Sequence, residues 1–460
     1  MEQRGWYFTA PWDPVHVRRG DALGLRAGAD YFADLLAPGL SNGTSDARWI
    51  SLLSWCLRWS HIAWRNAGGG DLSRRDDQRA RYAWLRPLEL LWIARTLTSQ
   101  QTTGQLRGRR SVKRWLDAIA EGRRLPDDFA MSPDQFRRYR QAGTYGAYRV
   151  VFRTIAGLTT GDGWTPEGTA LRLADLMNDA LPRGAQLREE HFENRTKWGH
   201  WSDGGEARYW VESGWRGALD TLGGVLPTTD GAVRERLPED ERRLLEAALF
   251  GANSVRRTTA EVLASASGAR SHPELCDALA ESATLARAIE PASLASLPAF
   301  TRLADTAMHA MRGLWDEMNT DNRAQAPTVE KLAQSTELQS RFVQLRTSSE
   351  AWLSAPGRST FPHENIATRL AEAMRGAASP VAQIRALERH HHQFGGGRRW
   401  FREHAGKLVP LVADTGIATS DYRFRLRSVC LLAAQCGVAN MNVALDAIRQ
   451  HGPDDDGDLL

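Results

Sequence analysis

The sequence predicts a mainly α-helical fold of several multi-helix domains, with a winged-helix-like module and small β elements. Apolar residues recur at helical spacing along most of the chain. Pro, Gly, Ser and Thr stand where those periodic segments begin and end, as expected for helix boundaries. The composition, 42% hydrophobic and 25% charged, is ordinary for a globular protein. A chain of 460 residues has room for about two to four domains.

Residues 1–104 are expected to form a helical N-terminal domain. Apolar spacing predicts helices over 22–37 and 49–64, and Pro38-Gly39 ends the first of them. A third helix is expected over 87–98, where the apolar density indicates burial. The tryptophans here lie among Leu and Ile at helical spacing, which favours a place in the core over a base-stacking surface: Trp49, Trp55, Trp59, Trp64, Trp84 and Trp92.

Residues 105–182 form a basic segment. Between Arg107 and Arg153 there are twelve Lys or Arg and five Asp or Glu, a net charge of +7, whereas the whole chain has +4. Such a local excess of positive charge favours contact with phosphates.

The same segment has the order of elements of a small DNA-binding module. Ser132-Pro133-Asp134 is expected to start one helix, and 145–155 is a second. Thr160–Gly163 forms a tight turn, and Thr165-Pro166 caps a helix to about Leu181. Helix, turn, helix, short wing and helix, in this order, is similar to a winged helix-turn-helix module.

The remaining chain divides by composition. Residues 183–237 are an irregular linker or small module rich in Trp and Gly, 238–394 a helical domain, 395–450 a Gly-rich turn with a short strand and a terminal helix, and 451–460 an acidic tail. Apolar periodicity predicts helices over 238–250, 258–266, 272–289, 298–319, 328–354, 365–375, from 381, and over 424–436, with a strand over 407–412.

Arg149 and Arg153 are the main candidates for phosphate contact, because they lie one turn apart on the expected recognition helix. Arg137 and Arg138 lie on the helix before it. Two other interpretations stay open: a solvated face in an arginine-biased proteome, since the chain has only four lysines, or a winged helix that contacts protein.

A second candidate segment runs from His390 to Phe401 and combines three imidazoles, three glycines and two arginines. Glycines allow close backbone approach, so Arg398 and Arg399 are expected to clamp an anion and Trp400 to lie against it. A simple flexible turn is the alternative. Because three consecutive histidines point in different directions, a helix C-terminal turn is favoured over a metal site.

Four scattered cysteines and the absence of a signal-peptide or membrane-spanning pattern predict a cytoplasmic bacterial protein without membrane contact. The sequence contains no P-loop, His-Glu-x-x-His or Glu-x-Lys motif. These absences favour a protein without catalytic residues, cofactor or bound metal.

Two stretches resemble uncharacterised helix-rich proteins of bacterial restriction and anti-phage defence gene clusters. The first is Arg19-Gly20-Asp21-Ala22-Leu23-Gly24-Leu25-Arg26, continued by 33–41, Thr44 and 47–50, and the second is the segment from His390 to Trp400. The resemblance covers only these stretches and carries no catalytic residue. It implies a non-motor component that acts beside a helicase, nuclease or ATPase.

Together these observations predict a non-catalytic component of a defence or DNA-processing complex that binds nucleic acid, DNA in the first place. One alternative is a metal-dependent nuclease that uses His390, His391 and His392 with Glu388 or Glu403. Another is a scaffold whose basic face contacts an acidic protein.

Overall fold

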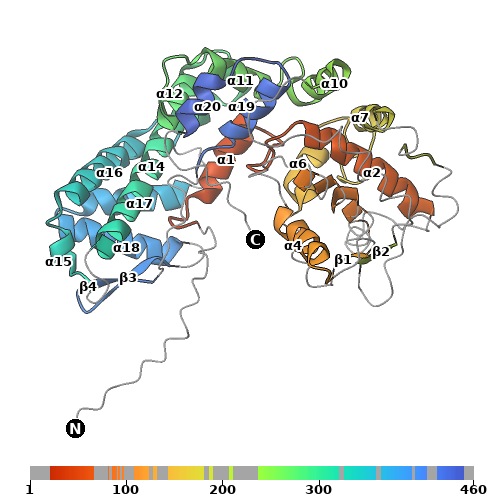
Figure 1. Ribbon diagram of the computed structural model, residues 1–460. Coiled ribbons are helices and arrows are strands. Elements are labelled where there is room, and N and C mark those ends of the chain that lie inside the picture. The colour runs from red at the N-terminus through yellow and green to blue at the C-terminus, as the bar shows by residue number, and fades with distance from the viewer. Residues whose placement is uncertain are drawn as a thin grey trace, which may run out of the picture. The chain divides into compact units, whose positions relative to one another are not determined.

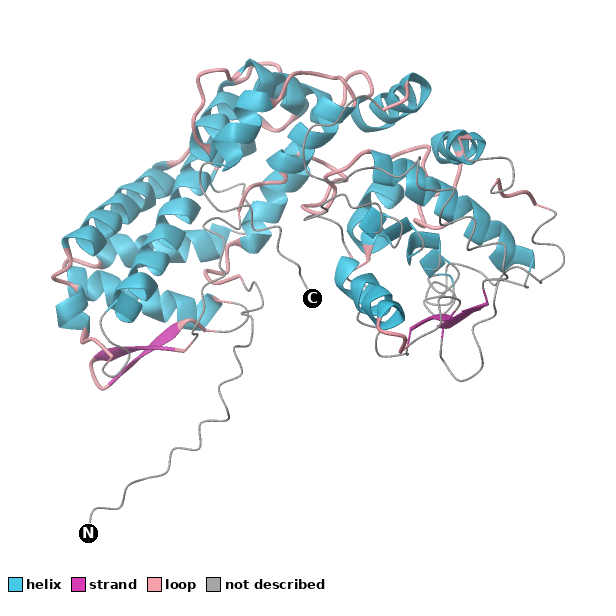
Figure 2. Cartoon of the chain, viewed as in Figure 1, coloured by secondary structure: helices cyan, strands magenta, loops and turns pink. Residues whose placement is uncertain are grey.

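The computed structural model confirms a mainly helical protein (Figures 1 and 2). It describes residues 21–66, 81–97 except 82–84, 87, 91 and 94–95, then 108–123, 128–131, 143–180, 186–189, 207–210, 237–320, 326–358, 364–395, 399–411 and 422–449. No helix among these residues is both long and apolar enough to cross a membrane.

The chain folds into two compact units, each assembled from segments that are distant in the sequence. Unit 1 comprises Met1–Phe32, Ala269–Phe424 and Ala447–Asp455. Unit 2 comprises Ala33–Gly268, Arg425–Asp446 and Asp456–Leu460. Two helices, α1 (Arg26–Leu36) and α20 (Asn442–Arg449), have residues in both units.

Unit 1 is a stack of helices around an aromatic core. Its central helix α14 packs against α12 and α16, and α16 packs in turn against α17. Phe300 lies at the centre, with its ring 5.2 Å from that of Phe32 and 5.8 Å from that of Trp352. The helices are α12 (His272–Glu281), α13 (Leu285–Ala288), α14 (Pro291–Thr320), α15 (Val329–Leu332), α16 (Thr336–Ser354), α17 (Glu364–Gly376) and α18 (Pro380–Phe394).

Serine side chains bond to the backbone at the breaks that divide two expected helices of unit 1. The prediction of single helices over 272–289 and 328–354 is wrong. Ser335 Oγ accepts from Leu338 N and begins a new helix there. Ser282 Oγ likewise accepts from Leu285 N. The helix expected to begin at Pro298 begins at Pro291 instead. Pro298 lies inside α14, where it removes one backbone hydrogen bond but does not end the helix.

A small antiparallel hairpin completes unit 1. Its strands β3 (Phe401–His404) and β4 (Lys407–Pro410) pair with Phe401 opposite Pro410 and His404 opposite Lys407. Most of the strand expected over 407–412 is therefore present, and its partner β3 was not predicted.

Unit 2 is built on α2 (Arg48–Asn66), which packs against α6 (Thr144–Thr154) and α7 (Gly168–Asp179). The predicted core tryptophans are buried where they are described: Trp49, Trp55, Trp59, Trp64 and Trp92. Trp84 lies outside the described residues. Its other elements are α4 (Arg109–Ala120), α10 (Glu239–Phe250), α11 (Val255–Ser265), α19 (Leu426–Gln435), and the paired strands β1 (Asp128–Met131) and β2 (Ala207–Trp210).

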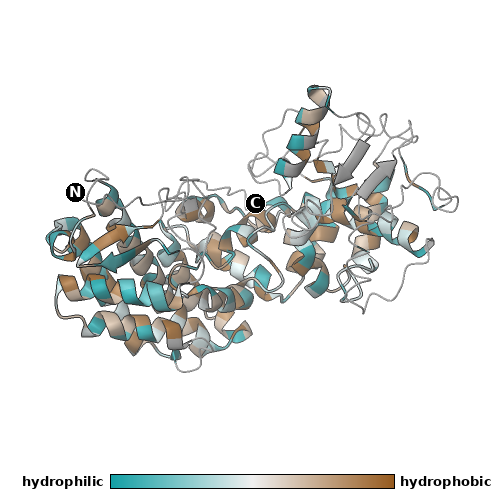
Figure 3. Ribbon diagram, turned by 90° about the horizontal axis from the view of Figure 1, so that it is seen from below, coloured by the Kyte–Doolittle hydropathy of each residue, from teal (hydrophilic) through white to brown (hydrophobic). Residues whose placement is uncertain are grey.

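The helices of both units are amphipathic, with hydrophobic and hydrophilic residues on different faces (Figure 3). All four cysteines are free and buried. Among the positively charged residues of the chain, arginine far outnumbers lysine.

Candidate nucleic-acid interface

The predicted site residues are divided between the two units. Arg149 and Arg153 lie on α6 in unit 2, whereas Arg399 and Trp400 lie in unit 1. Arg137, Arg138 and Arg398 lie outside the described residues, as does the helix expected to start at Ser132.

The turn that follows α6 is held by one carboxylate. Asp162 Oδ1 accepts from the backbone N–H groups of Trp164, at 2.6 Å, and Thr165, at 2.9 Å, and Oδ2 accepts from the Thr165 hydroxyl at 2.8 Å. A bridge between Thr159 and Pro166 closes the turn. Because Thr165 and Pro166 belong to the turn, they do not cap the next helix as predicted, and this helix begins at Gly168.

Trp164, at the end of this turn, is fully buried and lies close to two guanidinium groups. Arg149 Cζ lies 5.2 Å from the centre of its ring and Arg81 Cζ lies 5.9 Å from it. The Tyr145 ring is 4.9 Å away. Cations over the face of an indole are attracted by its negative π-face, so two arginines help to fix the turn against α6.

Arg81 is a buried cation that is bonded only to neutral groups. Its two terminal nitrogens donate to Ser60 Oγ and to the carbonyl oxygen of Leu57, each over 2.9 Å. Its Nε has no hydrogen-bond partner among the described residues. Burial lowers the pKa of the Arg81 guanidinium to about 10, so it is still charged at neutral pH.

We name this group the Trp164 cluster: His61, Arg65, Arg81, Arg149, Arg153, Asp162 and Trp164. Four of its members are arginines and one is a carboxylate. Burial favours the neutral acid at Asp162, but hydrogen bonds from Thr165 and Trp164 outweigh it and lower the pKa. Asp162 is thus ionised, but its oxygens are occupied by the turn.

The outer arginines of the Trp164 cluster are available to a ligand. Arg65 and Arg153 are exposed, and neither makes an ion pair within the described part of the chain. The stem of Arg153 packs over Gly163, where an added Cβ would lie 2.6 Å from Arg153 Cγ. This contact places the Arg153 side chain against the turn, while Arg153 as a whole is exposed to solvent.

The pKa of His61 is sensitive to the positive charge of the Trp164 cluster. Burial lowers its pKa to about 4, and the charges of Arg81 and Arg65 act in the same direction. The imidazole is therefore neutral at pH 7, and an anion bound beside it would raise its pKa.

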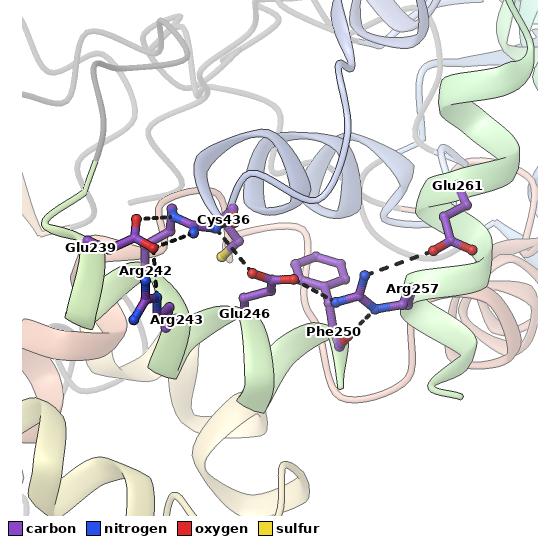
Figure 4. A network of polar contacts seen from close by, with 8 residues as sticks. All are labelled: Glu239, Arg242, Arg243, Glu246, Phe250, Arg257, Glu261 and Cys436. Carbon is purple, nitrogen blue, oxygen red and sulfur yellow. Dashed lines mark hydrogen bonds and ion pairs between the residues drawn. The ribbon is translucent and has the colours of Figure 1, made fainter. Parts of the chain in front are cut away.

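Other arginines of unit 2 form ion pairs with neighbouring carboxylates (Figure 4). Arg242 bonds Glu239 at 2.8 Å, Glu246 at 3.1 Å and the carbonyl oxygen of Cys436 at 3.0 Å. Each arginine drawn there has a carboxylate partner: Arg242 and Arg243 with Glu239, and Arg257 with Glu246 and Glu261. These ion pairs contrast with the exposed Arg65 and Arg153, which have no acidic partner among the described residues.

Helix α4 carries a second concentration of cations in unit 2. Arg109, Arg110, Lys113 and Arg114 all lie in its first half, and its first turn has no acidic residue. Positive side chains at a helix N-terminus oppose the helix dipole. Lys113 and Arg114 are exposed and make no ion pair with any described residue. These two side chains extend the positive surface of the basic segment.

The three histidines of unit 1 are hydrogen-bonded to the chain itself. His390 Nε2 lies 2.9 Å from the carbonyl oxygen of Leu23, and His391 Nδ1 lies 2.7 Å from that of Ala22. His391 Nε2 accepts from Trp400 N at 3.0 Å, so both of its nitrogens are engaged. His392 Nε2 lies 3.3 Å from both Glu388 and the Phe401 carbonyl oxygen.

The glycines of this segment bring two backbones together. A Cβ added at Gly395 would lie 2.6 Å from the carbonyl oxygen of Ala22, and one at Gly24 would lie 2.8 Å from that of Phe394. Gly24 has φ of +72°, which favours glycine. Gly395 and Gly24 thus allow the end of α18 and the segment before α1 to pack closely against each other.

The histidine segment offers little of what the metal-site alternative needs. No group of three or more His, Cys, Asp or Glu in the described ranges is arranged to hold a metal ion. Glu388 accepts from Glu403 N at 3.1 Å, and Glu403 binds Arg385 at 3.1 Å. The expected helix C-terminal turn is present, with Gly395 capping α18.

Arg399 and Trp400 face different environments. Arg399 is exposed, and its guanidinium donates to the carbonyl oxygen of His392 at 3.1 Å. Trp400 is 3% exposed, so its ring is enclosed by unit 1 and has no open face for a base. We therefore keep Arg399 in the candidate interface and leave Trp400 out of it.

Sequence reasoning missed His61, Arg65 and Arg81, because only tertiary packing brings Arg81 to Trp164 and His61 close to Arg65, Arg81 and Asp162. Trp164 had a local signal: it directly follows Gly161-Asp162-Gly163, a turn motif that exposes or fixes the next side chain. Comparison of the chain with protein-family models, curated proteins and solved structures finds no match.

Proposed function

We propose that this chain is a non-catalytic, nucleic-acid-binding component of a cytoplasmic bacterial defence or DNA-processing complex, with DNA as the first candidate ligand. The observation that carries the proposal is the Trp164 cluster, in which two exposed arginines without acidic partners among the described residues lie beside a buried contact between arginines and Trp164. Preorganised guanidinium groups are the usual means of gripping phosphates.

In this proposal the arginines of the cluster have two roles. Arg65 and Arg153 contact phosphates, because their side chains are exposed. Arg81 and Arg149 hold Trp164 and add long-range positive charge. The half-buried position of Arg149 makes it a support first and a phosphate contact second.

The winged-helix interpretation belongs to the same proposal. Helix α6 would be the recognition helix, and the turn closed by Thr159 and Pro166 would be the wing. Arg137, Arg138 and Arg398, which lie outside the described residues, are further candidates for phosphate contact. Catalysis would belong to a partner such as a helicase, nuclease or ATPase.

The test is fluorescence anisotropy with labelled duplex DNA, at several salt concentrations and without added metal. The variant is Arg65→Glu with Arg153→Glu. Loss of two phosphate contacts should weaken binding at least about tenfold and reduce the slope of log K against log salt by about 2.

A matched control separates site contacts from net charge. Arg270→Glu with Arg287→Glu makes the same change in net charge at two exposed arginines of unit 1 that have no ion pair among the described residues. Equal effects from the two double variants would contradict the proposed site. Absence of DNA and RNA binding at low salt, with firm co-purification of an acidic protein, would favour the scaffold alternative instead.

A further inference from the structure

The β3–β4 hairpin of unit 1 has one buried face and one basic face. Phe401 and Leu408 are fully buried on the inner face. Because side chains alternate along a strand, Arg402 and His404 lie together on the outer face, and the register places Lys407 directly opposite His404. All three outer residues are exposed.

The turn between the strands holds these residues in register. Ala405 has φ of +50° and Gly406 has φ of +74°, as in the two-residue turns that suit the twist of a hairpin. Nothing lies within 4 Å of a Cβ added at Gly406, so the space on that side of the turn is open.

Both edges of the hairpin are already occupied. On the β4 side, Leu408 N donates to Pro327 O at 2.9 Å and Val329 N donates to Gly406 O at 3.0 Å. On the β3 side, Glu403 N donates to Glu388, and the Phe401 carbonyl oxygen faces His392. A partner strand cannot add to such covered edges, which leaves the outer face as the accessible surface.

The neighbouring carboxylates are occupied as well. Glu403 and Glu330 bind Arg385, at 3.1 and 3.3 Å, and Glu388 lies 3.3 Å from His392. The exposed cations around the hairpin have no ion pair with any residue that the structure describes: Arg389, Arg399, Arg402 and Lys407. Charge on this surface is therefore unbalanced.

We infer that the outer face of the β3–β4 hairpin, with Arg402 and Lys407, is a second nucleic-acid contact, specific for duplex DNA. Its partner class rests on the proposed function, but the surface is separate from the Trp164 cluster and lies in the other unit. A two-stranded ribbon fits the major groove of B-DNA, whereas the major groove of an RNA duplex is too narrow.

The outer face also favours a duplex over a single strand. Its four residues are Arg402, His404, Lys407 and Val409, without Trp, Tyr or Phe. Single-strand binding surfaces combine a basic groove with aromatic rings on which bases stack. Diagonal positions such as Arg402 and Lys407 are about 7–8 Å apart on one face of a hairpin, so the two cations can bind separate phosphates.

The experiment measures anisotropy of the full-length chain with labelled duplex DNA, duplex RNA and single-stranded DNA of one sequence. For Arg402→Glu with Lys407→Glu we expect at least about tenfold weaker binding to duplex DNA and a salt slope smaller by about 2. Arg402→Gln with Lys407→Gln should show a smaller loss in the same direction. A thermal melt of each variant checks that the hairpin remains folded.

Comparison with the Trp164 cluster variant distinguishes the two proposals. If Arg65→Glu with Arg153→Glu weakens binding and the hairpin variants match the Arg270→Glu, Arg287→Glu control, the hairpin inference is overturned and the proposed function stands. If only the hairpin variants weaken binding, the inference stands and the Trp164 cluster is excluded. Equal losses on duplex RNA or single-stranded DNA, or equal binding of poly-glutamate, would overturn the assignment to duplex DNA.

Discussion

His391 Nδ1 lies 2.7 Å from the carbonyl oxygen of Ala22, while the other nitrogen of the same ring accepts from Trp400 N. One imidazole thereby joins three parts of unit 1: the segment before α1, the end of α18 and the start of the hairpin.

Replacing His391 should destabilise unit 1. His391→Ala leaves the buried Ala22 carbonyl and the Trp400 N–H without partners, at a cost of about 2–5 kcal/mol in unfolding free energy. Urea denaturation measures the loss. His404→Ala, on the exposed face of the hairpin, is the control and should change stability by less than about 0.5 kcal/mol. Equal stability of the two variants would show that the His391 bonds contribute little.

His390 should make the protein sensitive to acid. Burial lowers its pKa to about 4, against about 6.5 in the unfolded chain. The unfolded state therefore binds a proton that the folded state does not, and stability falls as the pH falls from 6.5 to 4. His390 is 4% exposed, and its contribution is up to about 3 kcal/mol. Denaturation of His390→Gln across this range should show a shallower pH dependence; an unchanged one would contradict the assignment.

His272 should act in the opposite direction. Burial favours its neutral ring, but the Cys276 thiol, with Sγ 3.8 Å from Nε2, and Asp305, 3.9 Å from Nδ1, outweigh burial and raise the pKa to about 10. Its stabilising contribution is complete below about pH 6.5 and is lost as the pH rises towards 10. Asp305→Asn should reduce this alkaline loss in a denaturation series from pH 6.5 to 10. The same alkaline loss in Asp305→Asn and wild type would count against a charged His272.

His61 provides a spectroscopic test of the Trp164 cluster. Its pKa of about 4 reflects burial first and then the charges of Arg81 and Arg65. Phosphates bound beside Arg65 would offset those charges, so saturating duplex DNA should raise the pKa of His61. Titration of its ring proton by NMR measures the shift, and Arg65→Gln alone should raise the pKa without DNA. No change on DNA binding would place the ligand away from His61.

The sequence predicted most of the helices because their apolar residues repeat with the period of a helix. It did not predict the division at Ser335, since the apolar pattern continues across a break that the serine side chain creates. Strand β3 was missed because Phe401-Arg402-Glu403-His404 has no β-branched residue. Contacts with α18 through Glu388 and His392 hold it in place.

The candidate site was predictable only in part. Helical spacing identified Arg149 and Arg153, but it could not show that Arg149 stacks on Trp164 while Arg153 is exposed. Arg65 and Arg81 join them through tertiary packing. The sequence around the histidines could not reveal their hydrogen-bond partners, because His391 and Ala22, for example, are 369 residues apart.

The most direct test of the central claim is the salt dependence of duplex DNA binding by wild type, Arg65→Glu with Arg153→Glu, and the Arg270→Glu, Arg287→Glu control. We predict salt-sensitive binding by wild type, a loss of at least about tenfold with a slope smaller by about 2 in the Trp164 cluster variant, and a much smaller change in the control. Wild-type binding that is absent at low salt, or equal losses in both variants, would contradict phosphate contact at the Trp164 cluster.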